Sequence, residues 1–506
     1  MSLAKRQVLS LMGLMKPEED GPLVLATYDV LLPCRWYDIE HKVAVLGRVS
    51  LTAEFLLRLL KSADGLDEAG AAAFFGFDLR DMSFVLSEVA GHGYVQRKDG
   101  RLWLTSAGQS LFRAESDQPQ IFGVEVVRES VGFDLLSFAP EPRQFLDAFD
   151  FSLPELAVGT DAAQASTQRV PSAFRRFYHE VQAARERKRD DKKREEKKSL
   201  YSIDNVAAGD RFFATVRLVV TATGMRPHAG EPDLSAWRSE PELEDRPNTL
   251  GAVSAFIDQL ATTRHSADHE AYDALVELAP EFLKDFTRLD GLSVDRYYRE
   301  AFTRTGDARS DRPTIPIVGS LLGRDNIRKA SEVLSYGLRE GSSPACIIWA
   351  APQVRNWGAT QLLPEFLRHL KSQLKGQASA GPPAIAVGLA SGRPDFYLGR
   401  AFDELATSEA PRLPRALELL VIPGVMTAAT VHAPIGSHSG LPVPLGFVSF
   451  DPRVVERAEA YLAGRIGPMI QQKAFEGVVT GALLRKAEPP VEEAAGPGDG
   501  GEPPAA

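Results

Sequence analysis

Between about residues 51 and 112, apolar positions recur first with the period of a helix and then with that of a strand. Three helices are predicted: one opens near Leu51 with Thr52 as its cap, a short one starts at Asp67, and Asp78 caps the third. The residues expected to pack between them are Phe55, Leu56, Leu59, Leu60, Ala71, Ala72, Phe74, Phe75, Leu79, Met82, Val85, Leu86 and Val89. Two strands follow around an Asp99-Gly100 turn, so a small helical unit with a hairpin is predicted.

This order of elements resembles the winged helix-turn-helix modules of many prokaryotic proteins, which bind DNA or partner proteins rather than small substrates. The candidate nucleic-acid contacts are Arg80 in the third helix and Arg97, Lys98 and Arg101 in the hairpin. Acidic residues lie beside Arg80, and a DNA-reading helix usually offers more cations than this one. The alternative is a packing or dimerisation unit with a solvated charged face, and the sequence leaves DNA and protein contact open.

A dense run of charge follows further along the chain. Residues 175–198 hold eleven Lys or Arg against six acidic residues, and residues 185–198 hold no apolar residue. Because such a segment cannot bury a face, it is predicted to be a solvated helix or a flexible linker. It adds auxiliary nucleic-acid candidates, namely Arg187, Lys188, Arg189, Lys192, Lys193 and Arg194. The alternative is an alternating-charge helix supported by pairs four residues apart.

From Ile315 to about Ile470, apolar strands alternate with amphipathic helices. The expected strands cover residues 315–318, 346–350, 384–389, 417–422, 429–433 and 445–450, and the expected helices cover 325–338, 361–374 and 396–406. This pattern predicts an α/β sheet with parallel or mixed strands. Outside this region, strands are predicted at 23–30 and 212–221, and a hairpin-like extension is predicted from strands at 121–127 and 131–136.

The order of the C-terminal elements is similar to the C-terminal half of the phospholipase D-like superfamily, over about 130 residues. In that family a strand carries His-x-Lys, an Asp follows shortly after, and a Gly-Ser-x-Asn turn comes next. Here His432 matches the His, but Pro434, Ser439 and Ser449 stand where the Lys, Asp and Asn belong. The resemblance therefore implies a degenerate domain that lacks the cation needed to hold phosphate oxygens.

His432 is accordingly expected to be a strand-end histidine with satisfied hydrogen bonds. The enzymatic alternative is a nuclease or phosphodiesterase that acts through His432 as a homodimer, with Arg393 or Arg453 supplying the positive charge.

Two further constellations point only weakly to chemistry. His265 and His269 are one helical turn apart, which is a zinc spacing, but no third ligand is evident and a polar helix end is the preferred interpretation. Residues 436–440 form a small-residue loop whose backbone N–H groups could cradle an anion, although the lysine of a nucleotide-binding loop is missing. Neither a metal nor a cofactor is expected.

Bulk composition narrows the class of protein. A chain of 506 residues exceeds what one core usually holds, and a net charge of −10 means that any nucleic-acid contact must come from a local basic patch. The only cysteines are Cys34 and Cys346, which excludes a disulfide framework and suits a reducing cytoplasm. The first residues lack a long apolar core and a small-residue cleavage site, so no signal peptide is expected, and no apolar run is long enough to cross a bilayer.

The expected architecture is an α/β multidomain chain. Its predicted parts are an N-terminal extension (1–46), a winged helix (47–115), a β extension (116–158), a linker with a charged helix (159–200), a mixed strand and helical region (201–310), a phospholipase D-like domain (311–485) and a disordered tail (486–506). The sequence predicts a cytoplasmic accessory subunit of a prokaryotic multiprotein system that binds nucleic acid or protein partners or self-associates, without a membrane contact. Fold analogy suggests anti-phage defence as one setting, and a purely structural adaptor is a further alternative.

Overall fold

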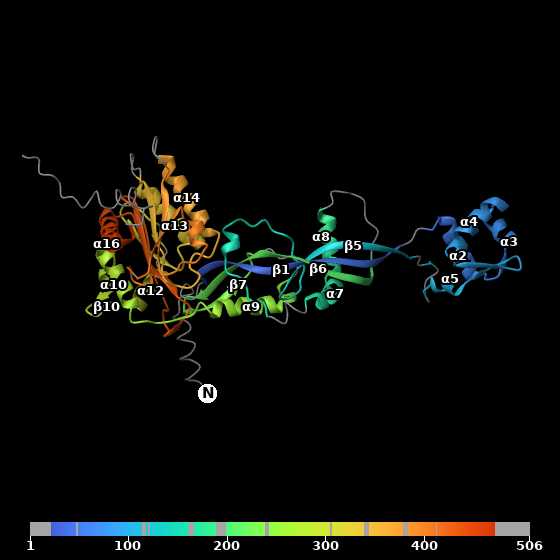
Figure 1. The fold of residues 1–506 in the computed structure, drawn as a ribbon, viewed down its shortest axis with the longest axis horizontal. Coiled ribbons are helices and arrows are strands. Elements are labelled where there is room, and N and C mark those ends of the chain that lie inside the picture. Colours follow the sequence, from blue (N-terminus) through green and yellow to red (C-terminus); the bar gives the residue numbers. More distant parts are fainter. Residues whose placement is uncertain are drawn as a thin grey trace, which may run out of the picture. The chain divides into compact units, whose positions relative to one another are not determined.

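The computed structural model describes residues 22–46, 49–113, 118–119, 122–159, 166–188, 199–237, 242–303, 306–338, 344–377, 383–410 and 412–470. The chain is a mixed α/β protein with several sheets (Figure 1). It divides into two compact units, each built from separate segments of the chain. Among the described residues, unit 1 contains those up to Pro33, 143–158 and 213 onward, and unit 2 contains 34–142 and 159–212 with their gaps.

Residues 49–113 of unit 2, which we call the 49–113 module, contain three helices and a small sheet. The helices are α2 (Leu51–Ser62), α3 (Glu68–Phe75) and α4 (Leu79–Gly91), and a short α5 (Ser106–Ser110) follows the sheet. The strands are β2 (Leu66–Asp67), β3 (Val95–Lys98) and β4 (Arg101–Leu104), in the order β2-β4-β3. The three helices and the hairpin predicted from the sequence are thus confirmed.

The caps of these helices follow the sequence with one exception. Asp67 caps α3 and Asp78 caps α4, each by accepting a bond from a backbone N–H of the first turn. The cap of α2, however, is Ser50, whose Oγ accepts from Ala53 N at 3.1 Å, so the prediction of Thr52 was wrong. Ser50 is held at the cap position by Glu88 of α4, whose carboxylate accepts hydrogen bonds from the backbone N and the Oγ of Ser50 at 2.7 and 2.6 Å.

A closed apolar core holds the 49–113 module together. The fully buried members are Ala53, Leu56, Leu57, Leu60, Ala71, Met82, Val89 and Leu102. Asp99 and Gly100 both have positive φ in the hairpin turn, as a two-residue turn matched to the strand twist requires.

The rest of unit 2 is built on a long antiparallel pair. β1 (Pro22–Leu46) begins in unit 1 and pairs with β5 (Phe122–Asp134) from Cys34 to Leu46. The predicted hairpin at 121–136 was wrong: β5 is one continuous strand, because β1 offers it an unbroken partner along its whole length. Helices α7 (Ser166–Arg176) and α8 (Tyr178–Lys188) pack Phe174 and Tyr178 against this pair.

One further long strand, β6 (Ser199–Thr223), contains residues of both units. It is 25 residues long, far longer than the predicted 212–221, and its end in unit 1 pairs with β7 (Arg226–Asp233). α9 (Pro247–Asp258) and the short strand β8 (Thr262–Thr263) follow in unit 1.

Unit 1 is centred on a seven-stranded mixed sheet in the order β11-β18-β16-β15-β12-β13-β14. These strands are β11 (Thr314–Val318), β12 (Cys346–Ala350), β13 (Ile385–Ser391), β14 (Glu404–Ser408), β15 (Leu417–Ile422), β16 (Met426–Ala433) and β18 (Val443–Ser449). β12, β13 and β14 are parallel neighbours, and the other pairings are antiparallel. The prediction of a mixed α/β sheet is confirmed.

Helices cover both faces of this sheet. Figure 1 shows α10 (Asp268–Leu278) and α16 (Pro452–Ile470) on one side, and α13 (Arg324–Gly337) and α14 (Leu362–Gln377) on the other. The remaining short elements are α11 (Pro280–Leu283), β9 (Thr287–Arg288), β10 (Gly291–Leu292), α12 (Val294–Thr303), α15 (Leu398–Ala401) and β17 (Ser439–Gly440).

One predicted helix was largely wrong. Of residues 396–406, only Leu398–Ala401 are helical, and β14 begins at Glu404. Glu404 lies opposite Val387 of β13, so pairing with an existing strand overrides the local helical pattern. No described helix is long and apolar enough to cross a membrane.

Candidate functional site

His432 lies near the end of β16 inside a buried polar cluster. Its Nε2 is 2.6 Å from Oε2 of Glu418 on β15, and Thr430 Oγ1 donates to the same oxygen at 2.7 Å. Trp349 of β12 donates from Nε1 to the other carboxylate oxygen at 3.1 Å. His432 is 6% exposed and Glu418 only 1%, so three neighbouring strands are joined by one buried carboxylate. The geometry fits a histidine with satisfied hydrogen bonds.

Among the described residues, no Lys or Arg forms an ion pair or a hydrogen bond with the His432 imidazole or the Glu418 carboxylate. The imidazole pairs with a carboxylate, and neither Arg393 nor Arg453, both exposed, forms a bond to it. Of the residues that the sequence analysis compared with the family motif, Pro434 is buried and Ser449 shares a hydrogen bond of 2.7 Å with Thr314. A catalytic role for His432 stays a prediction.

The basic residues of the 49–113 module are only partly available. Arg97 forms an ion pair with Glu68, and Arg101 donates from Nη1 to the carbonyl of Gly65 at 3.4 Å. Lys98 at the hairpin and Arg80 at the start of α4 are exposed. Two of the four candidate contacts thus have partners within the module.

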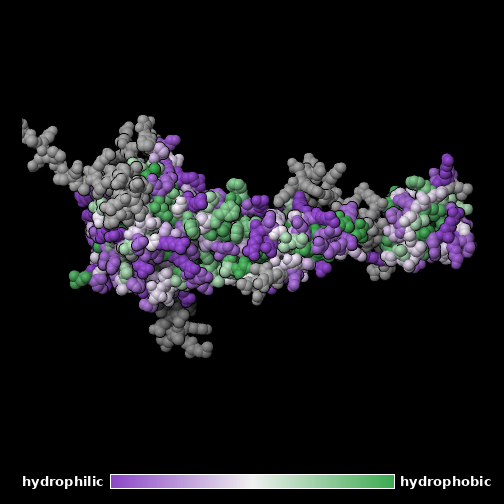
Figure 2. Space-filling model, viewed as in Figure 1, coloured by the Kyte–Doolittle hydropathy of each residue, from purple (hydrophilic) through white to green (hydrophobic). Residues whose placement is uncertain are grey.

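The surface of the 49–113 module also carries exposed aromatic rings. Phe84 of α4 is 72% exposed, and Phe74 of α3 is 68% exposed. The expectation that Phe74 packs in the core was wrong, and Phe55 is likewise exposed, because Ala71, Ala72 and the leucines of α2 already fill the space between the helices. Figure 2 shows hydrophobic residues, in green, among hydrophilic ones on the visible face of this module.

Sequence reasoning missed Phe84, although a signal was present. Phe84 is out of phase with Met82, Val85 and Val89, which are the buried residues of α4. A helix that buries one stripe must turn such a residue to solvent.

The charged run lies mostly outside the described residues. α8 ends at Lys188, and Arg187 donates from Nε to the carbonyl of Ala183 at 3.3 Å within that helix. The side chain of Lys188 and the whole of Arg189, Lys192, Lys193 and Arg194 lie beyond what the structure describes.

α8 also completes a buried charged cluster in unit 2. Glu129 of β5 is 2.6 Å from Arg185 Nη1 and 3.4 Å from His41 Nε2. Burial raises the pKa of the Glu129 carboxyl, which the charge of Arg185 partly offsets, and burial lowers the pKa of the His41 imidazole. Both shifts arise because an ionised group loses its hydration between the strands and α7–α8.

The histidine pair at 265 and 269 forms a polar helix start, as preferred from the sequence. His265 Nδ1 accepts from Ala267 N at 3.1 Å, and Asp268 Oδ2 accepts from His265 N at 2.8 Å. Within the described ranges, no group of three or more His, Cys, Asp or Glu is placed to hold a metal ion.

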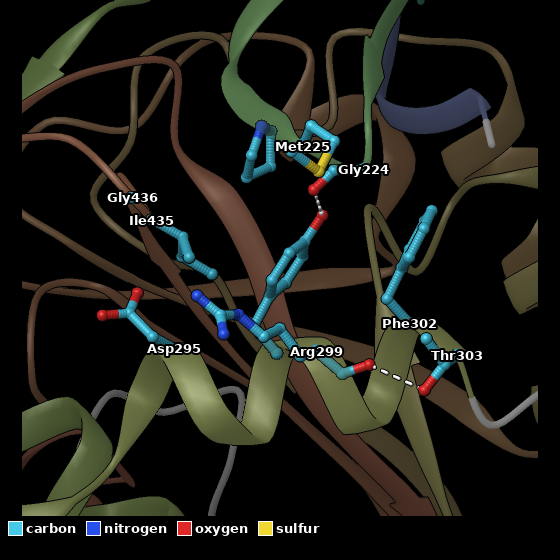
Figure 3. A pocket seen from close by; sticks show the side chains of 10 residues that line it. Gly224, Met225, Asp295, Arg299, Phe302, Thr303, Ile435 and Gly436 are labelled. Atoms are coloured by element: carbon cyan, nitrogen blue, oxygen red, sulfur yellow. Dashed lines mark hydrogen bonds between the residues drawn. The ribbon is translucent and has the colours of Figure 1, made fainter. Parts of the chain in front are cut away.

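Unit 1 contains a surface cavity of about 380 Å³ (Figure 3), which the first residue of the small-residue loop, Gly436, helps to line. Its floor is α12, and its other walls come from the β6–β7 turn at Gly224 and Met225 and from Ile435 and Gly436 just after β16. Tyr298 donates from its hydroxyl to Gly224 O at 3.0 Å, which fixes the ring against the turn. The cavity therefore combines segments that are far apart in the sequence.

Comparison with known protein families, with curated proteins and with solved structures finds no match for this chain. Function must therefore be argued from the geometry of this molecule alone.

Proposed function

We propose that this protein is a binding subunit that docks a protein partner through the 49–113 module, which we assign as a winged helix. Under this proposal the C-terminal α/β domain is a degenerate relative of the phospholipase D-like enzymes that serves as a scaffold. A cytoplasmic prokaryotic multiprotein system, with anti-phage defence as one example, is the setting that fold analogy suggests.

The observation that carries this proposal is the character of α4, which is the helix that a winged helix presents to DNA. Its solvent face offers Phe84 and two serines, and Arg80 is its only cation. The whole module holds seven Lys or Arg against eight Asp or Glu, whereas a DNA-binding domain is normally basic. Exposed aromatic rings on a nearly neutral surface are typical of protein interfaces.

The experiment compares full-length variants recovered by an affinity tag from the cells that make the protein. The Phe84→Ser variant should no longer co-purify with the proteins that bind the wild type. The substitution removes an exposed aromatic side chain that anchors the partner and leaves the packing of the core unchanged. Phe145→Ser is the matched control, since Phe145 is 95% exposed and lies in unit 1. Co-purification that survives Phe84→Ser would refute docking through α4.

Contact with nucleic-acid phosphates is a second candidate, supported by the exposure of Arg80 and Lys98. A gel shift at low salt with labelled single- and double-stranded DNA tests it. We expect no shift with the wild type. A shift that disappears in the Arg97→Glu/Lys98→Glu variant would make the module a DNA binder instead.

The enzymatic alternative is tested in the same DNA mixtures. Metal-independent cleavage by the wild type that is lost in His432→Ala would overturn the scaffold assignment of the α/β domain. We expect intact DNA with both proteins, because the imidazole is buried against Glu418.

A further inference from the structure

The cavity over α12 is lined by one positive and one negative side chain that do not form an ion pair with each other. Asp295 and Arg299 are four residues apart on the helix and both line the cavity (Figure 3). Opposite charges at this spacing are neighbours and commonly pair. Yet the described residues provide neither side chain with an ion pair or a hydrogen bond. An acceptor and a donor therefore stand about one helical turn apart beside an open space.

Apart from Thr303, the remaining walls of the cavity are mainly apolar or aromatic. Figure 3 shows Met225 above the cavity, with Phe302 and Ile435 on opposite sides of it. Tyr298 stacks on Phe302 with their centroids 5.9 Å apart and their planes 17° apart, and its hydroxyl donates to the carbonyl of Gly224. Such a small apolar space with few polar groups is typical of small-molecule sites, which span roughly 300–1,000 Å³.

We propose that this cavity binds a free α-amino acid with an apolar side chain. The ligand's carboxylate accepts hydrogen bonds from the Arg299 guanidinium, its ammonium donates to the Asp295 carboxylate, and its side chain packs against Met225 and Phe302. The end of a peptide presents only one of these two charges, so it satisfies only one member of the Asp295–Arg299 pair. The requirement for both charges on one small molecule selects the free amino acid.

The test is calorimetric titration of the full-length protein with three related probes. L-Phenylalanine carries both charges, N-acetyl-L-phenylalanine lacks the cation and imitates a peptide C-terminus, and L-phenylalaninamide lacks the carboxylate and imitates an N-terminus. We expect L-phenylalanine to bind with a Kd at or below the millimolar range, and each blocked form to bind at least about tenfold more weakly.

Variants then assign the binding to this cavity. Arg299→Gln and Asp295→Asn should each weaken L-phenylalanine at least about tenfold, and Arg299→Lys should restore part of the loss. Arg296→Gln is the matched control, because Arg296 is an exposed arginine of the same helix that lies over Phe286 and does not line the cavity. Unchanged melting of the unliganded variants shows that they fold.

Three results would overturn the proposal. They are no heat with millimolar L-phenylalanine, binding that Arg299→Gln leaves unchanged, and binding of a blocked form as tight as that of the free amino acid. Tight binding of a blocked form would mean that the cavity binds a peptide terminus, a C-terminus if the N-acetyl form binds and an N-terminus if the amide binds. None of these results bears on docking through α4, which is measured with other variants.

Discussion

Glu418→Gln is the substitution that most directly tests the structural role of the cluster around His432. The change keeps the volume and shape of the side chain, so no cavity forms in the sheet. It replaces one of the two acceptor oxygens by an NH2 group, which only donates. The carboxylate forms hydrogen bonds with the side chains of Trp349, Thr430 and His432. An amide has only one acceptor oxygen, so it cannot accept hydrogen bonds from all three.

The magnitude follows from the three contacts. In the better orientation the amide oxygen keeps Thr430 and His432, and its NH2 group faces the indole N–H of Trp349. One buried donor is then left without an acceptor, and the bonds from Thr430 and His432 lose the charge on their acceptor. We expect a loss of about 2–4 kcal/mol in the free energy of unfolding, which is a drop of roughly 4–8 °C in Tm at about 2 °C per kcal/mol for a unit of this size.

The assay is thermal unfolding followed by near-ultraviolet circular dichroism, which reports the packing of the buried Trp349. Glu409→Gln serves as the control. Because Glu409 is exposed, this variant should have the same Tm as the wild type. A Glu418→Gln variant that melts within about 1 °C of the wild type would show that the cluster contributes nothing net. In that case the arrangement around His432 would need a functional explanation.

Three further outcomes are expected. Gly446→Ala should lower stability by about 1–3 kcal/mol in chemical unfolding, because a Cβ there would lie 1.8 Å from Ala429 O. Arg217→Met should cost about 2–4 kcal/mol by leaving the buried Asp29 carboxylate without its counter-charge, 2.8 Å away, and adding Asp29→Asn should recover part of it. Because burial raises the pKa of Glu129, the contribution of this carboxyl to stability falls as pH rises from about 4.5 through its folded-state pKa, so the Tm of the wild type minus that of Glu129→Gln should fall as pH rises above 4.5; a difference that stays constant with pH would contradict this.

The sequence by itself determined the elements whose signals are local. The caps Asp67 and Asp78 and the Asp99-Gly100 turn act through groups within a few residues, and the apolar strands of the seven-stranded sheet stand out as continuous buried runs. It also showed that Pro434 follows His432 by two residues, so no lysine stands two positions after that histidine. These features need no knowledge of distant contacts.

The tertiary structure alone decided which partners these elements meet. β1 and β6 each extend to 25 residues, well beyond the strands predicted at 23–30 and 212–221, because neighbouring strands supply backbone hydrogen bonds along their length. The sequence could not show that Glu418 contacts His432, or that Arg299 and Met225 line the same cavity. Strand pairing and burial depend on residues tens to hundreds of positions away in the chain. Local periodicity shows which face of a helix or strand is buried. Only the packed fold shows which other element that face contacts.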